Sequence, residues 1–141
     1  MLTTLSCVIG RLIALFRAEY GLSQAEFGAP IGYDRSLVAR LEVGRNIINV
    51  DNIHDVEHLL VEGGLLARPG DLLLLGNRVA LELHRRGYRV MTGKAEDHVG
   101  QELLDLSILD RVVASIADSY LQAEELPPPS SPKPVQPRRQ R

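Results

Sequence analysis

Residues 21–60 read GLSQAEFGAPIGYDRSLVARLEVGRNIINVDNIHDVEHLL, and this stretch carries the clearest structural signals in the chain. Ser23, with Glu26 three residues later, forms the pattern of a capping box, which predicts that a helix begins at this point. Pro30 and Gly32 follow soon afterwards, and neither residue favours the interior of a helix. The spacing therefore predicts a short helix that ends in a tight turn around Gly32.

Further helices are predicted on both sides of this turn. Asp34 is expected to cap a helix over 35–43, and Asn49 is expected to cap another over 50–62. Upstream, apolar residues recur at helical spacing over 4–20, and a glycine follows directly. The first 62 residues are therefore expected to form four helices.

The second half of the chain is also predicted to be mostly helical. Asp71 is expected to cap a long helix over 71–86, and residues 88–92 read as a short strand or an extended loop. Helices are expected over 95–106 and over 107–125. The last of these has the clearest apolar stripe in the chain, formed by Ile108, Leu109, Val112, Val113, Ile116, Tyr120 and Leu121.

Composition excludes several kinds of protein. The 141 residues include one cysteine, Cys7, so the chain can form neither an internal disulfide nor a zinc site built from cysteines. Arg11 and Arg17 interrupt the apolar N-terminal segment, which reads neither as a signal peptide nor as a membrane span. The cytoplasm is the expected location.

Charge is distributed unevenly along the chain. The net charge is −2, and residues 127–141 hold four of the 16 Lys and Arg residues and none of the 18 Asp and Glu residues, which leaves residues 1–126 at −6. The terminal segment reads PPPSSPKPVQPRRQR, a proline-rich basic composition that predicts disorder. A DNA-binding surface therefore has to come from a local cluster of cations or from this tail.

The two short helices around Gly32 point to such a cluster. A short helix, a tight turn and a second short helix are typical of a helix-turn-helix, whose second helix enters the major groove of DNA. On that second helix, Arg35, Ser36 and Arg40 are polar, and the last two are four residues apart and share a side. Arginine can bind guanine through two hydrogen bonds, and serine can form hydrogen bonds with more than one kind of base. These three residues are the expected base-facing residues.

Residues 10–60 resemble the Cro/cI-type, or Xre, family of repressors. The resemblance runs without a gap from Gly21-Leu22-Ser23-Gln24 through Glu42-x-Gly44 to Leu60 and covers roughly a third of the chain. It implies a lambda-repressor-like helical head.

The resemblance also implies roles for particular residues. Gln24, Arg45 and Asn46 would contact DNA phosphates, and Arg35, Ser36 and Arg40 would occupy the base-facing positions. Arg17 and Glu42 match a pair that often forms a structural salt bridge in this family, so Glu42 is interpreted as scaffold. Glu57 departs from the pattern, because a small buried residue is usual there.

Two other patterns each allow an ordinary structural interpretation and a functional one. His54 and His58 are spaced as in helical zinc pairs, but no third ligand is evident, so exposed or capping roles are expected. Cys7 is expected to be a small buried apolar residue, and a redox sensor is the alternative.

Residues 72–92 resemble one strand-helix-strand unit of a nucleotide-binding fold. The glycine fingerprint of that fold is missing, and too few residues remain for a parallel sheet. An enzyme would need a pocket with a perturbed acid or base near residues 71–105. We expect no catalytic residues, cofactor or metal.

The sequence therefore predicts an all-α protein with a helix-turn-helix DNA-binding head (1–66), a helical dimerisation or effector region (67–126) and a disordered basic tail (127–141). The expected function is a transcriptional regulator, most simply a repressor. It would read the major groove of double-stranded DNA with residues 34–43, as a homodimer held through residues 108–121. The alternative is a protein-interaction module, such as an antitoxin or adaptor, with a protein partner at the C-terminal region.

Overall fold

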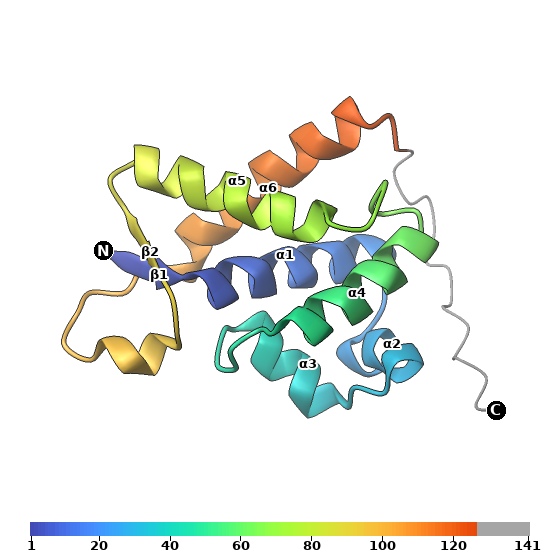
Figure 1. Cartoon of the computed structure of the whole chain (residues 1–141), viewed down its shortest axis with the longest axis horizontal. Helices are drawn as coiled ribbons and strands as arrows, with labels where there is room; N and C mark the ends of the chain where they lie inside the picture. The colour runs from blue at the N-terminus through green and yellow to red at the C-terminus, as the bar shows by residue number, and fades with distance from the viewer. Residues whose placement is uncertain (127–141) are drawn as a thin grey trace.

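The computed structural model describes residues 1–126, and the predicted tail over 127–141 lies outside the described residues. The described chain is mostly helical, with six α-helices and one small two-stranded sheet (Figure 1). In chain order the elements are β1 (Leu2–Thr4), α1 (Leu5–Tyr20), α2 (Gln24–Gly28), the 3-10 turn η1 (Ala29–Ile31), α3 (Arg35–Glu42), α4 (Val50–Glu62), α5 (Asp71–Arg85), β2 (Arg89–Met91), the 3-10 turn η2 (Ala95–His98) and α6 (Leu106–Ala123).

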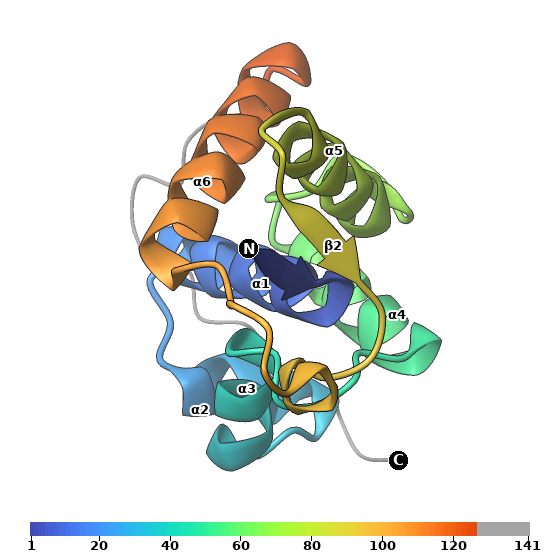
Figure 2. The ribbon, with the colours of Figure 1, turned by 90° about the vertical axis from the view of Figure 1, so that its left-hand side faces the viewer.

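Helix α1 is the central element of the molecule. Helices α5 and α6 pack on one side of it, and α2, α3 and α4 lie on the other (Figures 1 and 2). Because it is covered on both sides, α1 buries most of its length, including Leu12, Ile13 and Phe16. This placement gives residues 1–66 and residues 67–126 one shared hydrophobic core.

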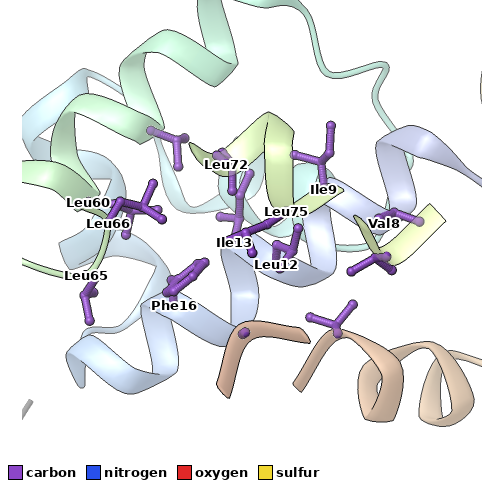
Figure 3. Packing of buried hydrophobic residues seen from close by; sticks show 14 of the residues in the cluster. Val8, Ile9, Leu12, Ile13, Phe16, Leu60, Leu65, Leu66, Leu72 and Leu75 are labelled. Carbon is purple, nitrogen blue, oxygen red and sulfur yellow. The ribbon is translucent and has the colours of Figure 1, made fainter. Parts of the chain in front are cut away.

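The shared core is built mainly from aliphatic side chains, with Phe16, Phe27 and Tyr120 as its largest fully buried members. Figure 3 shows Leu60, Leu66, Leu72 and Leu75 gathered around the α1 side chains, Phe16 among them. Burial of such side chains is the main favourable term in folding. The core therefore joins α4, α5 and the loop between them to α1.

The apolar stripe of α6 lies inside this same core. Leu109, Val112, Val113 and Tyr120 are each at most 1% exposed, because α6 packs on α1 and α5 of its own chain. The side chains of the stripe that stay half-buried are Ile108, Ile116 and Leu121. A dimer partner could reach only this edge of the stripe.

The small sheet modifies the expectation of an all-α fold. Strands β1 and β2 are parallel, with Thr3 opposite Val90, so the strand alternative for residues 88–92 is confirmed. The N-terminal strand itself was not expected. Leu2 also donates to the carbonyl of Glu102 (2.9 Å) and accepts from Leu104 N (2.7 Å), which ties β1 to a third segment.

Two expectations about local structure were wrong. The helix over 95–106 is present only as the single turn η2, because the backbone of 102–104 extends to pair with Leu2. Asp71 is the first residue of α5 and not its cap. Gly70 occupies the cap position and has no side chain that could accept a hydrogen bond. Glu57 on α4 accepts hydrogen bonds from Gly70 N (2.6 Å) and Leu72 N (3.0 Å), the role that was expected of Asp71.

The expected helices over 4–20, 35–43, 50–62 and 107–125 are present to within two residues. The nucleotide-binding alternative for residues 72–92 is wrong, because Leu72–Leu75 lies in α5 and not in a strand. Within residues 1–126, no helix is both long and apolar enough to cross a membrane.

Candidate nucleic-acid interface

Helices α2 and α3 are short because each has a local start and a local stop. Ser23 caps α2 in a reciprocal capping box with Glu26, and η1, which contains Pro30, follows at once. The chain reverses at Gly32, whose φ of 74° is in the left-handed region that glycine adopts without strain. Asp34 then caps α3, accepting from Leu37 N at 2.7 Å.

The three expected base-facing residues lie on the exposed surface of α3. Arg35, Ser36 and Arg40 are all exposed, whereas Val38 and Leu41 on the other side are at most 2% exposed and belong to the interior. The Arg40 guanidinium donates to the Ser36 hydroxyl at 3.2 Å. The structure therefore brings Ser36 and Arg40 together on the outer surface of α3, and Arg35 is exposed at the start of the same helix.

The three residues that are expected to contact phosphates differ in their exposure to solvent. Arg45 is exposed in the turn after α3, and Asn46 beside it is half-buried. Gln24 at the start of α2 is also half-buried, and its amide donates to Oε1 of Glu42 at 3.0 Å. One of the two N–H groups of the Gln24 amide is thus already used inside the chain.

Glu42 lies at the centre of a network of hydrogen bonds between α1, α2 and α3. Arg17 donates from Nε (2.6 Å) and Nη2 (3.0 Å) to its two carboxylate oxygens, and the third nitrogen, Nη1, donates to the Leu22 carbonyl at 2.9 Å. The Glu42 side chain is 4% exposed and that of Arg17 is 20% exposed. The pair therefore joins the helices that carry the candidate interface.

Sequence reasoning missed a second arginine that acts in the same way. Arg11 donates from Nε (2.7 Å) and Nη2 (3.1 Å) to Asp110 on α6, and from Nη1 to the Glu42 carbonyl at 3.1 Å. The hydrogen bonds with Asp110 raise the pKa of Arg11. Arg11 and Asp110 are 99 residues apart, and no local pattern relates them.

Tyr33, in the turn before α3, was also not anticipated. Its hydroxyl donates to Asp55 (2.8 Å) and accepts from the side chain of Asn52 (2.9 Å), both on α4. Burial raises the pKa of this tyrosine. These contacts attach the turn to α4, so the path of the chain into α3 is held by side chains as well as by Gly32.

The remaining candidates have ordinary surroundings. His58 lies 3.0 Å from Glu62 on the exposed side of α4, and no group of three His, Cys, Asp or Glu side chains within residues 1–126 could hold a metal ion. Cys7 is buried, and this burial raises the pKa of its thiol.

A scan against protein-family models and searches of curated proteins and of solved structures found no match to this chain.

Proposed function

We propose that this protein is a sequence-specific DNA-binding transcriptional regulator of the cytoplasm, most simply a repressor. In this proposal α2, η1 and α3 act as a helix-turn-helix in a Cro/cI-like head, and α3 enters the major groove. The observation that carries the proposal is the two-sided character of α3: Arg35, Ser36 and Arg40 face solvent, and Val38 and Leu41 are buried.

The dimensions of α3 support this proposal. A helix with its side chains is about 10–12 Å across and fits a major groove about 12 Å wide, and the eight residues of α3 make about two turns that can lie in it. Arg40 is held by Ser36, so its guanidinium loses less freedom on meeting a base edge. Arg45 lies just beyond α3, where a phosphate would pass.

The negative charge of residues 1–126 argues for binding as a homodimer. A net charge of −6 weakens attraction to DNA, so a few local arginines have to provide the contacts. Two heads reading half-sites about one helical turn apart convert the second contact into an intramolecular one, which raises avidity. The half-buried edge of α6 is the part of the stripe that remains for such contact.

The test is selection of bound sequences from a random pool of double-stranded DNA by the full-length protein. Enrichment of a palindrome with half-sites about one turn apart is the expected result. Enrichment of a single half-site would support DNA reading but not the dimer. A pool with no enriched sequence, at low salt as well as at physiological salt, would overturn the proposal.

A second candidate function is a protein-interaction module such as an antitoxin or adaptor. The segment after β2 favours it: Ala95 shares a small cavity with Val43 at the end of α3, and nearby Val99 and Leu103 are 90% and 49% exposed. The same segment carries Glu96, Asp97, Glu102 and Asp105. Acidic and apolar groups beside α3 suit a protein surface better than a phosphate backbone.

The two candidates differ in their response to one substitution. Val99→Ser removes an exposed apolar side chain from the second surface and leaves the arginines of α3 unchanged. Under the leading proposal the selected DNA sequence and its affinity stay as in the wild type. Under the second candidate the wild type selects no DNA sequence, and Val99→Ser instead weakens binding of the protein partner, because it removes an apolar side chain that is 90% exposed on that surface.

A further inference from the structure

A groove of about 540 Å³ lies between α1, the C-terminal end of α3 and the first half of α6. Four of its five charged lining residues form two hydrogen-bonded ion pairs, Arg11 with Asp110 and Arg17 with Glu42, and the fifth, Glu19, is exposed. Each charge in the Arg11–Asp110 and Arg17–Glu42 pairs already has a partner within the chain, so these pairs do not form a binding site for a charged ligand. This pairing indicates that the groove is where the chain connects the interface helix to the C-terminal region.

Arg11 makes that connection at the end of α3. The Glu42 carbonyl, which accepts from Arg11 Nη1, belongs to the last residue of α3. Carbonyls in the last turn of a helix have no partner within the helix, and a cation is favourable at this end of the helix dipole. Arg11 therefore satisfies a helix-terminal acceptor and also contributes favourable charge.

The backbones of α1 and α3 come close together at the same place. A Cβ atom on Gly10 would lie 2.1 Å from the Leu41 carbonyl oxygen, and one on Gly44 would lie 2.8 Å from Cys7 Cα. No larger side chain fits at either contact without moving the backbone. The C-terminal end of α3 thus rests directly on α1, next to the residue that holds it.

Asp110 determines where the Arg11 guanidinium points. Its two carboxylate oxygens accept from two nitrogens of Arg11, a forked geometry that fixes the plane of the guanidinium. The third nitrogen is thereby directed at the Glu42 carbonyl. The Asp110 side chain is 43% exposed, so this pair contributes little to stability compared with its effect on orientation.

We propose that Asp110, acting through Arg11, is a positioning residue for α3, so that α6 is part of the unit that reads DNA. The inference rests on the proposed function. The effect of Asp110 should therefore differ between the two ends of α3. Arg40 lies near the end that Arg11 holds, whereas Arg35 lies at the start, which Asp34 caps independently.

The experiment compares Asp110→Asn with Asp118→Asn, a matched change at an exposed position of the same helix. We expect Asp110→Asn to melt close to the wild type and to bind the selected DNA between about 2- and 30-fold more weakly, the range typical of mutations that alter coupling between sites. Discrimination should fall most at the base read by Arg40 and least at the base read by Arg35. Asp110→Glu, which keeps the carboxylate, should recover part of the loss.

Amide hydrogen exchange provides a readout that needs no DNA. In Asp110→Asn, the Val43, Gly44 and Arg45 amides, which bond back into the last turn of α3, should exchange faster, while Leu37 N should not change. Unchanged exchange at these amides, or a loss of discrimination that is uniform along the site, would overturn the inference. If the wild type binds no DNA, the proposed function fails, and the exchange pattern still decides whether Asp110 holds the end of α3.

Discussion

Arg17 and Glu42 are joined by two hydrogen bonds, Nε to Oε2 at 2.6 Å and Nη2 to Oε1 at 3.0 Å, and the Glu42 side chain is almost fully buried. Glu42 also receives the Gln24 amide on its side chain and Arg11 on its carbonyl. One residue at the end of α3 therefore gathers contacts from α1 and α2.

Replacing Glu42 by alanine should destabilise the protein as well as weaken DNA binding. Removal of one partner from a buried ion pair leaves the other without compensation, and the expected loss is about 3 kcal/mol of the free energy of unfolding, at the low end of the buried range because Arg17 is partly exposed. Urea unfolding measures the loss. A variant that unfolds like the wild type but does not bind DNA would move Glu42 from the scaffold to the binding surface.

Arg35→Ala and Arg40→Ala should each reduce sequence discrimination without affecting the fold. Both side chains are exposed, so core packing is unchanged, and each good base contact is worth about 1–3 kcal/mol of discrimination. Binding to the selected site and to a scrambled site is compared by fluorescence anisotropy. Arg78→Ala, at an exposed position on α5, is the control and should behave as the wild type. If both interface variants match this control, the assignment of α3 to the groove is wrong.

Glu57 is expected to stabilise α5 from a distance. Its carboxylate accepts from the Gly70 and Leu72 amides at the start of that helix, a position at which a negative charge is favourable. Glu57→Ala should cost about 2–3 kcal/mol, because the buried Leu72 amide and the partly buried Gly70 amide lose a charged acceptor. Glu57→Gln keeps an acceptor oxygen and should cost about half as much. A Glu57→Ala variant that unfolds at the same urea concentration as the wild type would show that the carboxylate does not act as a cap.

Tyr120 should make the protein sensitive to alkaline pH. Burial, followed by the hydrogen bond to Asp71, raises the pKa of Tyr120 to about 12 from an ordinary value of 10. Below pH 10 the phenol is protonated in both the folded and the unfolded chain, so Tyr120 makes its full contribution to the free energy of unfolding. Between pH 10 and about 12 the unfolded chain loses this proton and the folded chain does not, so the free energy of unfolding falls as pH rises.

The comparison with Tyr120→Phe isolates this effect. At pH 7 the variant should be less stable by about 1–2 kcal/mol, because Asp71 and the Ala67 amide lose a partner. Above pH 10 this difference should shrink. Tyr88→Phe, at a half-buried tyrosine near β2, controls for the loss of a hydroxyl. A difference between Tyr120→Phe and the wild type that stays constant up to pH 11 would contradict the expectation.

Two substitutions on α6 separate core from dimer contact. Val112 is 1% exposed, so Val112→Asp buries a charge in the monomer and should prevent folding. Ile116 is half-buried at the edge of the stripe, so Ile116→Asp should leave a folded chain that has lost its partner. Sedimentation at micromolar concentration distinguishes a dimer from the 15.6 kDa monomer. A wild type that sediments only as monomer removes the dimer from the proposed function.

Local chemistry alone determined the helices of the candidate interface. Ser23, Asp34 and Asn49 each accept a hydrogen bond from an amide three residues later, so the signal and its effect lie within one turn of chain. The outward position of Arg35, Ser36 and Arg40 follows from the same helical period that buries Val38 and Leu41. These features can be read from the sequence because they do not depend on distant residues.

Only the tertiary structure decided the features that join distant segments. Residues 95–106 can form a helix by propensity, yet 102–104 pairs with Leu2, because backbone groups of β1 need partners at that place. The cap of α5 comes from Glu57, and the support of α3 comes from Asp110, although nothing beside either residue in the sequence indicates its partner. The sequence determined where α2, α3 and α4 begin, since their caps act over a few residues. Which side chains meet was decided by packing around α1, since that packing brings together residues as much as 99 positions apart.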